Sequence, residues 1–284
     1  MKPPPFGYSR PGSVTQAVAD LAAHGPDAKV LAGGQSLLPL LNMRLATPAH
    51  LVDINRLSEL SYVSVGDGEV RIGALARHAQ VLADRTVQAA QPLIGQALRL
   101  VAHPVIRNRG TTVGSIVHAD PSGEMTAVLA LLGGSVRLVS AAGERSVPAA
   151  EFFLGPLESD VREDELATEV TLPALGPRAG TAFAEVSRRS GDYAVCGVAV
   201  IAEVGDDGHM VSARAAYLSV AGTPLVLDLT EAGGPEDAAR LATDRVSPGG
   251  DIHATAAYRR HLAGVLTRRA LGAALAQAKE RSVG

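Results

Sequence analysis

The sequence predicts an α+β fold that ends in a domain of sheet plus helices. Short apolar stretches with alternating periodicity are separated by segments whose apolar residues recur at helical spacing. The 284 residues are 46% hydrophobic and 19% charged, which indicates a globular protein with room for two or three subdomains. The run "LPALGPRAG" contains two prolines and two glycines, and it predicts a domain boundary at that point.

The first third of the chain alternates between the two periodicities. We expect a helix over 13–25, capped by Ser13 and stopped by Gly25. The strand "AKVLAGG" precedes the helix "SLLPLLNMRLA", whose first turn contains Pro39, and the strand "HLVDI" follows. The segment "YVSVGDGEVRIGA" predicts a hairpin around Gly-Asp-Gly, and residues 76–102 are expected to be helical.

The remainder continues in the same manner. The segment "HPVIRNRGTTVGSIVHADPSGEM" predicts loops, because Gly110, Gly114 and Gly123 interrupt any regular pattern. It is followed by the apolar helix "TAVLALLGG" and by the strands "SVRLV", "ERSVPAAEFF" and "ATEVTLP". Beyond the expected boundary we predict the strands "TAFAEVSRR", "YAVCGVAVIAEV" and "VSARAAYLSV", and helices near 235–243 and 252–278.

Charge and hydropathy exclude several function classes. The net charge is −3 and the pI is 6.2, whereas a nucleic-acid-binding domain usually has a pI above ~9 or a basic stripe. No apolar run reaches the roughly 18 residues that a bilayer requires, and the N-terminus lacks a signal-peptide pattern. We therefore expect no nucleic-acid partner, no transmembrane segment and a cytoplasmic location.

The cysteine and histidine patterns argue against a metal centre. Cys196 is the only cysteine, and it lies in an apolar strand, which predicts a buried and unreactive thiol. A single cysteine excludes internal disulfides and any cluster that needs four thiolates. The histidines form neither H-x-H nor H-E-x-x-H, so we predict no metal site.

The stretch "VLAGGQSLL" indicates an anion-binding turn. A strand, two glycines and a helix that begins with serine direct several unpaired N–H groups to one point, at the positive end of the helix dipole. The glycines matter because a side chain would hold an anion away from the amides. A phosphate would be stabilised there, although a simple tight turn explains this motif equally well by itself. The two commonest nucleotide fingerprints, G-x-G-x-x-G and G-x-x-x-x-G-K-[ST], are absent.

A second glycine-rich segment, "NRGTTVGSIVHADPSGE", strengthens the ligand interpretation. It adds the hydroxyl groups of Thr111, Thr112 and Ser115 and the carboxylates of Asp120 and Glu124. Two amide-rich loops can hold a diphosphate, and a carboxylate accepts hydrogen bonds from ribose or ribityl hydroxyls. A dinucleotide such as FAD has all of these groups.

Four stretches carry a family resemblance, in matching order and spacing: "MKPPPFGYSRPGSV", "AGGQSLLPLLNMRLATPAHLVDIN", "HPVIRNRGTTVGSIVHADPSGE" and "RRSGDYAVCGVAV". Over nearly its whole length the chain resembles the FAD-binding medium subunit of molybdenum hydroxylases, the group of aerobic carbon monoxide dehydrogenase and xanthine dehydrogenase. The resemblance implies the two-subdomain FAD-binding fold of the vanillyl-alcohol oxidase / p-cresol methylhydroxylase type. The expected FAD-binding subdomains are 1–57 and 58–175, and the expected C-terminal flavoprotein domain is 176–284.

The resemblance also implies which residues contact FAD. Around the diphosphate, the first loop would contribute Ala32, Gly33, Gly34, Gln35 and Ser36, and the second Thr111, Thr112, Gly114 and Ser115. Leu31 and Leu37, which flank the first loop, would also contact the cofactor. Glu124 would contact the sugar-like part of FAD, and His118 would lie beside the cofactor. The residues expected at the flavin ring are Ala102, Ile106, Leu166, Ala167 and Tyr193, with Tyr193 covering one side near the reactive nitrogen.

The chain departs from the family pattern at two places. Relatives usually have two glycines where this chain has Val113 and Gly114, so a side chain occupies a turn that is often bare. Some relatives place a lysine near the flavin from the strand that here contains Ala184 and Glu185. No basic residue stands at either position.

The resemblance implies that non-covalent FAD passes electrons from iron–sulfur clusters to an external acceptor. The clusters would lie on a small partner subunit and the molybdenum cofactor on a large one, in a dimer of heterotrimers. No catalytic residue is assigned, because the spacing of His118 and Asp120 fits a loop around a cofactor as well as a dyad. Two alternatives stay open: a free-standing FAD-dependent reductase of the same superfamily, and a structural subunit without cofactor, which Val113 suggests.

Overall fold

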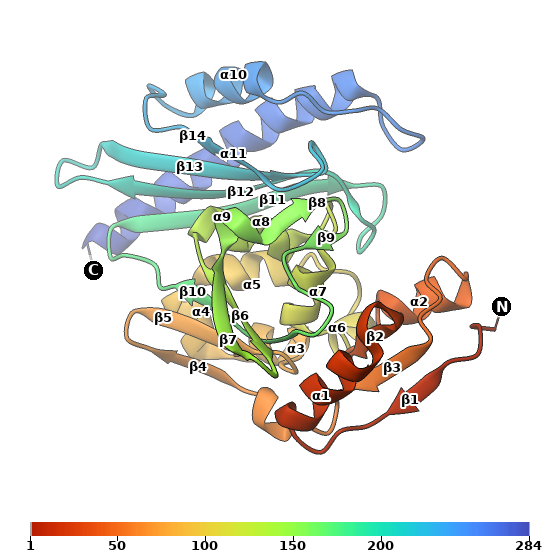
Figure 1. Cartoon of the computed structure of the whole chain (residues 1–284). Helices are drawn as coiled ribbons and strands as arrows, with labels where there is room; N and C mark the ends of the chain where they lie inside the picture. Colours follow the sequence, from red (N-terminus) through yellow and green to blue (C-terminus); the bar gives the residue numbers. More distant parts are fainter. Residues whose placement is uncertain (1, 284) are drawn as a thin grey trace.

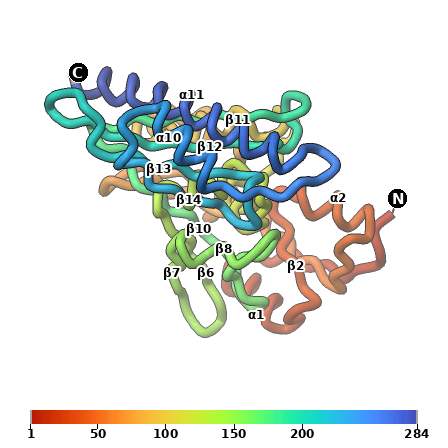
Figure 2. The backbone as a smooth tube through the Cα atoms, turned by 90° about the horizontal axis from the view of Figure 1, so that it is seen from above, coloured from red at the N-terminus to blue at the C-terminus, as the bar shows by residue number. Residues whose placement is uncertain are grey.

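The computed structural model describes residues 2–283 and contains three main β-sheets, each covered by helices (Figure 1). The α+β class predicted from the sequence is confirmed. The three sheets follow one another along the chain. In space, the N-terminal sheet lies at one end of the molecule, and the C-terminal sheet with its helices lies over the middle sheet (Figures 1 and 2).

The first sheet is parallel, with the order β1-β3-β2. Its strands are β1 (Gly7–Ser9), β2 (Ala28–Leu31) and β3 (His50–Asp53). Helix α1 (Val14–His24) has the expected caps: the Ser13 hydroxyl accepts a hydrogen bond from the N–H of Gln16, and Gly25 has φ +53°. A 3₁₀ turn, η1 (Gly25–Asp27), leads into β2, and α2 (Leu37–Asn42) connects β2 to β3. Strand β1 was not predicted from the sequence, because its three residues are too few to show a periodic pattern.

The second sheet is antiparallel, with the order β4-β5-β10-β6-β7. Its strands are β4 (Val63–Gly66), β5 (Glu69–Gly73), β6 (Ser135–Ser140), β7 (Gly143–Pro148) and β10 (Leu166–Pro173), and η2 (Ser58–Leu60) precedes it. The hairpin predicted around Gly-Asp-Gly is confirmed, with Asp67 and Gly68 at positive φ. The strand predicted for "ERSVPAAEFF" is half wrong, since β7 ends at Pro148 and the chain continues as α9 (Ala149–Phe152) and the small pair β8 (Phe153–Gly155) and β9 (Glu158–Ser159).

Residues 76–102 do not form the continuous helical segment that their apolar spacing predicts. They form α3 (His78–Ala83), α4 (Arg85–Ala90) and α5 (Pro92–Leu98). Asp84 separates α3 from α4, because its carboxylate caps α4 by accepting hydrogen bonds from the N–H groups of Thr86 and Val87. Pro92 separates α4 from α5, because it has no N–H to continue the preceding helix. The segment predicted as loops contains α6 (Pro104–Arg107), α7 (Thr112–His118) and the start of α8 (Glu124–Leu132).

The third sheet is antiparallel in sequence order: β11 (Ala179–Ser187), β12 (Ala194–Val204), β13 (Met210–Leu218) and β14 (Leu225–Asp228). Helix α11 (Ala256–Val283) lies across its outer face, and α10 (Pro235–Arg245) packs on α11 (Figure 1). At Gly180 the backbone of β11 meets α11 so closely that a Cβ atom would collide with the carbonyl oxygen of Ala274.

The inner face of the third sheet packs on the central part of the chain through α5 and α8. Ala199, Ala216 and Leu218 on this face are buried in the same core as the second sheet. A separate core fills the space between the outer face and α10 and α11. Within residues 2–283, no helix combines the length and the apolar character needed to cross a membrane.

Candidate cofactor site

The turn between β2 and α2 presents a row of free main-chain donors. Within residues 2–283, the N–H groups of residues 33–37 have no hydrogen-bond partner. Gly34 has φ +72°, which turns the chain sharply at this point. The Gln35 side chain bends back onto the carbonyl oxygen of Gly33 (3.0 Å), and the Ser36 hydroxyl makes no capping bond. Five consecutive donors of this kind suit a polyanionic group.

The two glycine loops expected to share a ligand are in direct contact. A Cβ atom on Gly33 would lie 2.8 Å from Cα of Gly110 and would collide with the carbonyl oxygen of Arg109. Only glycine allows the first loop to approach the backbone of the second this closely. The juxtaposition of the loops, which the sequence analysis inferred from ligand chemistry alone, is therefore present in the fold.

A polar network that the sequence analysis missed holds the loops together. The Asn55 amide donates to the carbonyl oxygen of Ala32 (2.8 Å) and accepts from Arg77 Nη2 (2.6 Å). Arg77 Nη1 then donates to the carbonyl oxygen of Arg109 in the second loop (2.7 Å). One signal was available, because Asn55 is the last residue of the matching stretch "AGGQSLLPLLNMRLATPAHLVDIN". Nothing in the sequence marked Arg77.

The second loop begins α7, and its residues divide into buried and exposed groups. The Thr111 hydroxyl caps the helix by accepting from the N–H of Gly114 (3.2 Å). Thr112 is fully buried, its N–H donates to Ala76 and its hydroxyl contacts His78, so neither group is left for a phosphate. The Val113 side chain points into the core, so it does not fill the turn. Gly114 is exposed and Ser115 half-buried at the surface of this loop.

His78 supports the second loop from below. It is 4% exposed, its Nδ1 lies 3.2 Å from Oγ1 of Thr112, and its N–H donates to the carbonyl oxygen of Gly110 (3.0 Å). Burial, with a smaller effect from the positive charge of Arg107, lowers the pKa of His78 to about 4. The imidazole is therefore neutral at neutral pH.

The low pKa of His78 predicts a loss of stability in mild acid. The unfolded chain takes up this proton near pH 6.5 and the folded chain only near pH 4, so stability falls as the pH drops between these values. At about 1.4 kcal/mol per pKa unit, the full loss is about 3 kcal/mol. Urea unfolding at pH 7, 6, 5 and 4 should show this loss as a difference between the wild type and His78→Gln, because buried acids such as Glu124, whose pKa is raised, contribute an opposite slope to both proteins. A His209→Gln control, which removes an exposed histidine, should follow the wild type at every pH.

Four of the five residues expected at the flavin ring lie in or just before α6 and at the start of β10. Ala102 has φ +45° in the turn before α6, which contains Ile106. Arg107 Nη1 fixes this turn by donating to the carbonyl oxygens of Val101 (2.8 Å) and Ala102 (3.0 Å). Leu166 and Ala167 begin β10, which has a bulge between Ala167 and Glu169.

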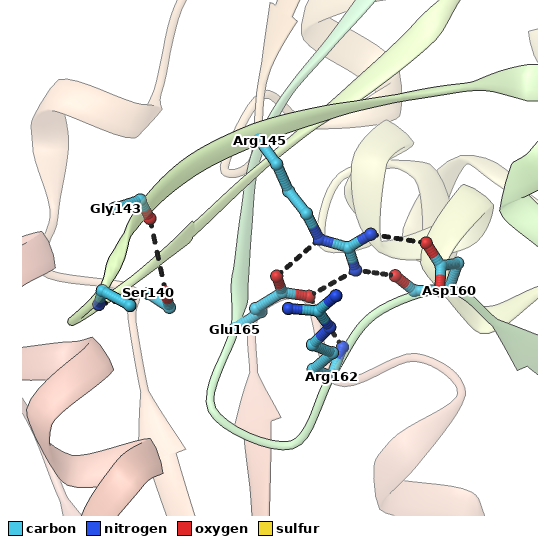
Figure 3. A network of polar contacts seen from close by, with 7 residues as sticks. Ser140, Gly143, Arg145, Asp160, Arg162 and Glu165 are labelled. Atoms are coloured by element: carbon cyan, nitrogen blue, oxygen red, sulfur yellow. Dashed lines mark hydrogen bonds and ion pairs between the residues drawn. The ribbon is translucent and has the colours of Figure 1, made fainter.

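An arginine network anchors the start of β10 (Figure 3). Arg145 of β7 forms a two-pronged pair with Glu165, with Nε–Oε1 at 2.6 Å and Nη2–Oε2 at 2.7 Å, and Arg145 Nη1 donates to Asp160 at 2.6 Å. Burial would raise the pKa of Glu165, but the hydrogen bonds from Arg145 and from the N–H of Arg162 outweigh it and lower the pKa. The backbone directly before Leu166 is therefore held in place.

Tyr193 lies at an open edge of the site. It follows a turn in which Gly191 has φ +81° and approaches the His103 ring so closely that a Cβ atom would lie 2.5 Å from Cε1. The His103 ring thus supports this turn. Tyr193 is 68% exposed, which leaves its ring available to cover a ligand.

Glu124 is the most unusual ionisable group of the site. It is the first residue of α8 and is 8% exposed. Burial first, then the negative charges of Glu185 and Asp120, raise its pKa to about 8. At neutral pH the carboxyl group is therefore mainly protonated and can donate as well as accept a hydrogen bond. His118 is the last residue of α7.

These residues fit a bound dinucleotide. The free N–H groups of residues 33–37 provide for a diphosphate, and Glu124 can hydrogen-bond hydroxyl groups. Within residues 2–283, no group of three or more His, Cys, Asp or Glu side chains is placed so that it could hold a metal ion. Cys196 is fully buried, and burial raises its pKa to about 12, so it is a thiol at neutral pH as expected.

Comparison with known proteins agrees with this geometry. A family model described as "FAD binding domain in molybdopterin dehydrogenase" matches residues 4–175, and one described as "CO dehydrogenase flavoprotein C-terminal domain" matches residues 181–274. The chain is 38% identical to the 6-hydroxypseudooxynicotine dehydrogenase complex subunit alpha of Paenarthrobacter nicotinovorans, over 98% of this chain and 97% of that one.

Solved structures resemble the whole chain. Carbon monoxide dehydrogenase from Hydrogenophaga pseudoflava superimposes with a TM-score of 0.91 at 37% identity, over 98% of this chain and 99% of that one. Quinoline 2-oxidoreductase from Pseudomonas putida 86 gives a TM-score of 0.90 at 35% identity, over 99% of both chains. On these matches, the chain belongs to the family of FAD-binding medium subunits of the molybdenum hydroxylases.

Proposed function

We propose that the chain binds FAD non-covalently and is the electron-transfer subunit of a molybdenum-containing hydroxylase. The observation that carries this proposal is the contact between the two glycine loops at Gly33 and Gly110, beside the free N–H groups of residues 33–37. A diphosphate accepts several hydrogen bonds and carries negative charge, so it matches donors that no protein group uses.

The residues of the chain would bind, orient and shield the cofactor. Residues 33–37 and the exposed start of α7 would hold the diphosphate, and Glu124 the sugar-like part. Ala102 and the start of β10 would position the ring system, and Tyr193 would cover it. Bound FAD accepts electrons singly or in pairs, so it can connect one-electron clusters to a two-electron acceptor.

The other redox groups would lie on partner subunits. The sequence contains one cysteine, whereas iron–sulfur clusters usually need four thiolates. Several relatives are named as the medium chain of a dehydrogenase. We therefore assign the iron–sulfur clusters to a small subunit and the molybdenum cofactor to a large one, and we expect a dimer of heterotrimers.

Native purification tests the proposal. The protein should be yellow, with absorbance near 450 nm and on the order of one FAD per chain. Denaturation should release the FAD, and a small iron–sulfur protein and a large molybdenum protein should copurify. A colourless native preparation would favour the structural-subunit alternative. If NAD(P)H bleached the flavin of a lone chain and a small substrate restored it, the reductase alternative would replace the proposal.

A further inference from the structure

Arg77 is attached through its backbone to the second glycine loop. The N–H of Thr112 donates to the carbonyl oxygen of Ala76 (3.2 Å). On the other side of Arg77, the N–H of His78 donates to the carbonyl oxygen of Gly110 (3.0 Å). Arg77 itself forms an isolated antiparallel bridge with this loop. The Cα atom from which its side chain starts is therefore held beside the loop.

The Arg77 side chain reaches the contact between the two loops. Its Nη1 donates to the carbonyl oxygen of Arg109 (2.7 Å), which is the atom that a Cβ atom on Gly33 would strike. Its Nη2 donates to Oδ1 of Asn55 (2.6 Å), and the Asn55 amide donates to the carbonyl oxygen of Ala32 (2.8 Å). One guanidinium group is thus bonded to the second loop and, through Asn55, to the first.

Arg77 forms no ion pair within residues 2–283, although it is half-buried. The carboxylate of Asp53 accepts from the Asn55 amide (2.6 Å), but it also accepts from the Tyr8 hydroxyl and pairs with Arg10 (3.7 Å). An arginine stays protonated at any pH that a folded protein tolerates. A positive charge that is partly withdrawn from water is costly without a counter-charge, so this position favours an anionic ligand.

The groups around Arg77 add positive potential and further donors. The free N–H groups of residues 33–37 begin at Gly33, and the exposed side chain of Arg109 also forms no ion pair within the described residues. A guanidinium group has five N–H donors, of which protein groups in residues 2–283 use two. A diphosphate provides the negative charge and the acceptor oxygens that this arrangement lacks.

We propose that Arg77 is a further residue of the FAD site, and that its guanidinium group supplies the positive charge that offsets the diphosphate. The inference rests on the proposed function, because the two glycine loops are assigned to FAD. The N–H groups of residues 33–37 provide hydrogen bonds, whereas Arg77 provides charge and keeps the loops in contact. The diphosphate in turn supplies the counter-charge of the guanidinium group, so FAD binding and the contact between the loops stabilise each other.

The test is FAD binding to the full chain after removal of its cofactor, measured by flavin fluorescence between about 20 mM and about 500 mM KCl. Arg77→Gln removes the charge but keeps a side chain that can donate a hydrogen bond. We expect roughly tenfold weaker FAD binding at low salt. The difference from the wild type should close at high salt, because added ions screen the lost interaction. Arg77→Lys, which keeps the charge, should retain the wild-type salt dependence.

Arg281→Gln is the matched control. Arg281 is also half-buried, forms no ion pair within residues 2–283, and donates from Nη2 to the carbonyl oxygen of Gly176 (3.3 Å) near the end of α11. The control removes the same charge at another place, so its FAD affinity should match the wild type at every salt concentration. If Arg77→Gln does not fold, Asn55→Asp replaces it, because the new carboxylate would accept the same hydrogen bond and offset the guanidinium charge. This variant should also weaken FAD binding most at low salt.

Two results would overturn the inference. One is an Arg77→Gln or Asn55→Asp protein whose FAD affinity equals that of Arg281→Gln. The other is an equal, salt-independent loss in Arg77→Gln and Arg77→Lys, which would mean that Arg77 acts only by joining the loops. A wild-type chain that binds no FAD at any salt concentration would instead overturn the proposed function.

Discussion

Gly33→Ala is expected to weaken FAD binding by roughly 100-fold, or about 3 kcal/mol. The added methyl group would collide with the carbonyl oxygen of Arg109 and lie 2.8 Å from Cα of Gly110. Both obstacles are main-chain atoms, so no rotamer change relieves the clash and the two loops must separate. The free N–H groups of residues 33–37 would then move away from the second loop.

The comparison uses the FAD dissociation constant, from flavin fluorescence, together with the thermal midpoint of each protein. Gly66→Ala is the matched control, since a Cβ atom on Gly66 would meet nothing within 4 Å. Gly66 ends β4 in the β4–β5 hairpin and belongs to neither glycine loop. We expect wild-type affinity in this control. Unchanged affinity in Gly33→Ala would show that the loop contact does not form part of the cofactor site.

The local part of the site was accessible from the sequence because it depends on backbone chemistry. Paired glycines before an apolar helix predict free donors, and the structure places the free N–H groups of residues 33–37 at that point. The direct contact at Gly33 and Gly110 has no sequence signature, because it depends on how two distant loops pack. The same reason explains why Arg77, which connects those loops, was missed.

In the second loop, residue type alone does not distinguish residues that face a ligand from residues that support the fold. Thr111 and Thr112 are chemically equal in the sequence, yet one caps a helix and the other is buried against His78. Val113 departs from the family pattern, but its side chain points into the core, so the turn keeps its bare outer surface. The role of a single residue in this loop can therefore be assigned only when its position in the folded structure is known.

The fold errors have physical causes of the same kind. Apolar periodicity over 76–102 was real, but it continues across two breaks at Asp84 and Pro92, because three short helices present their apolar sides to one core. Strand β14, with only four residues, was missed because its side chains alternate between exposed and half-buried rather than apolar-core positions. Long strands such as β12 were easy to predict because their apolar runs are continuous.

Arg145→Met is expected to destabilise the protein by about 3 kcal/mol, because it leaves a buried charge without its partner. The Glu165 side chain is 4% exposed, and without Arg145 only the N–H of Arg162 (2.8 Å) remains to bond it (Figure 3). A surface pair provides the control: in Arg268→Met the partner Glu236 has a side chain that is 71% exposed, so the loss should be about 0.5 kcal/mol or less.

The pH dependence separates a lost ion pair from a lost side chain. The folded-state pKa of Glu165 is lowered, so its stabilising contribution is present above the unfolded value and disappears as the pH falls through the folded one. Urea unfolding should therefore show the Arg145→Met deficit at pH 7 and a smaller deficit at pH 4. The double variant Arg145→Met, Glu165→Gln should recover part of the loss at pH 7, because it removes the unpaired charge. A deficit independent of pH and unaffected by Glu165→Gln would mean that Arg145 acts by packing alone. The start of β10 would then be held by the packing of the Arg145 side chain and not by neutralisation of the Glu165 charge.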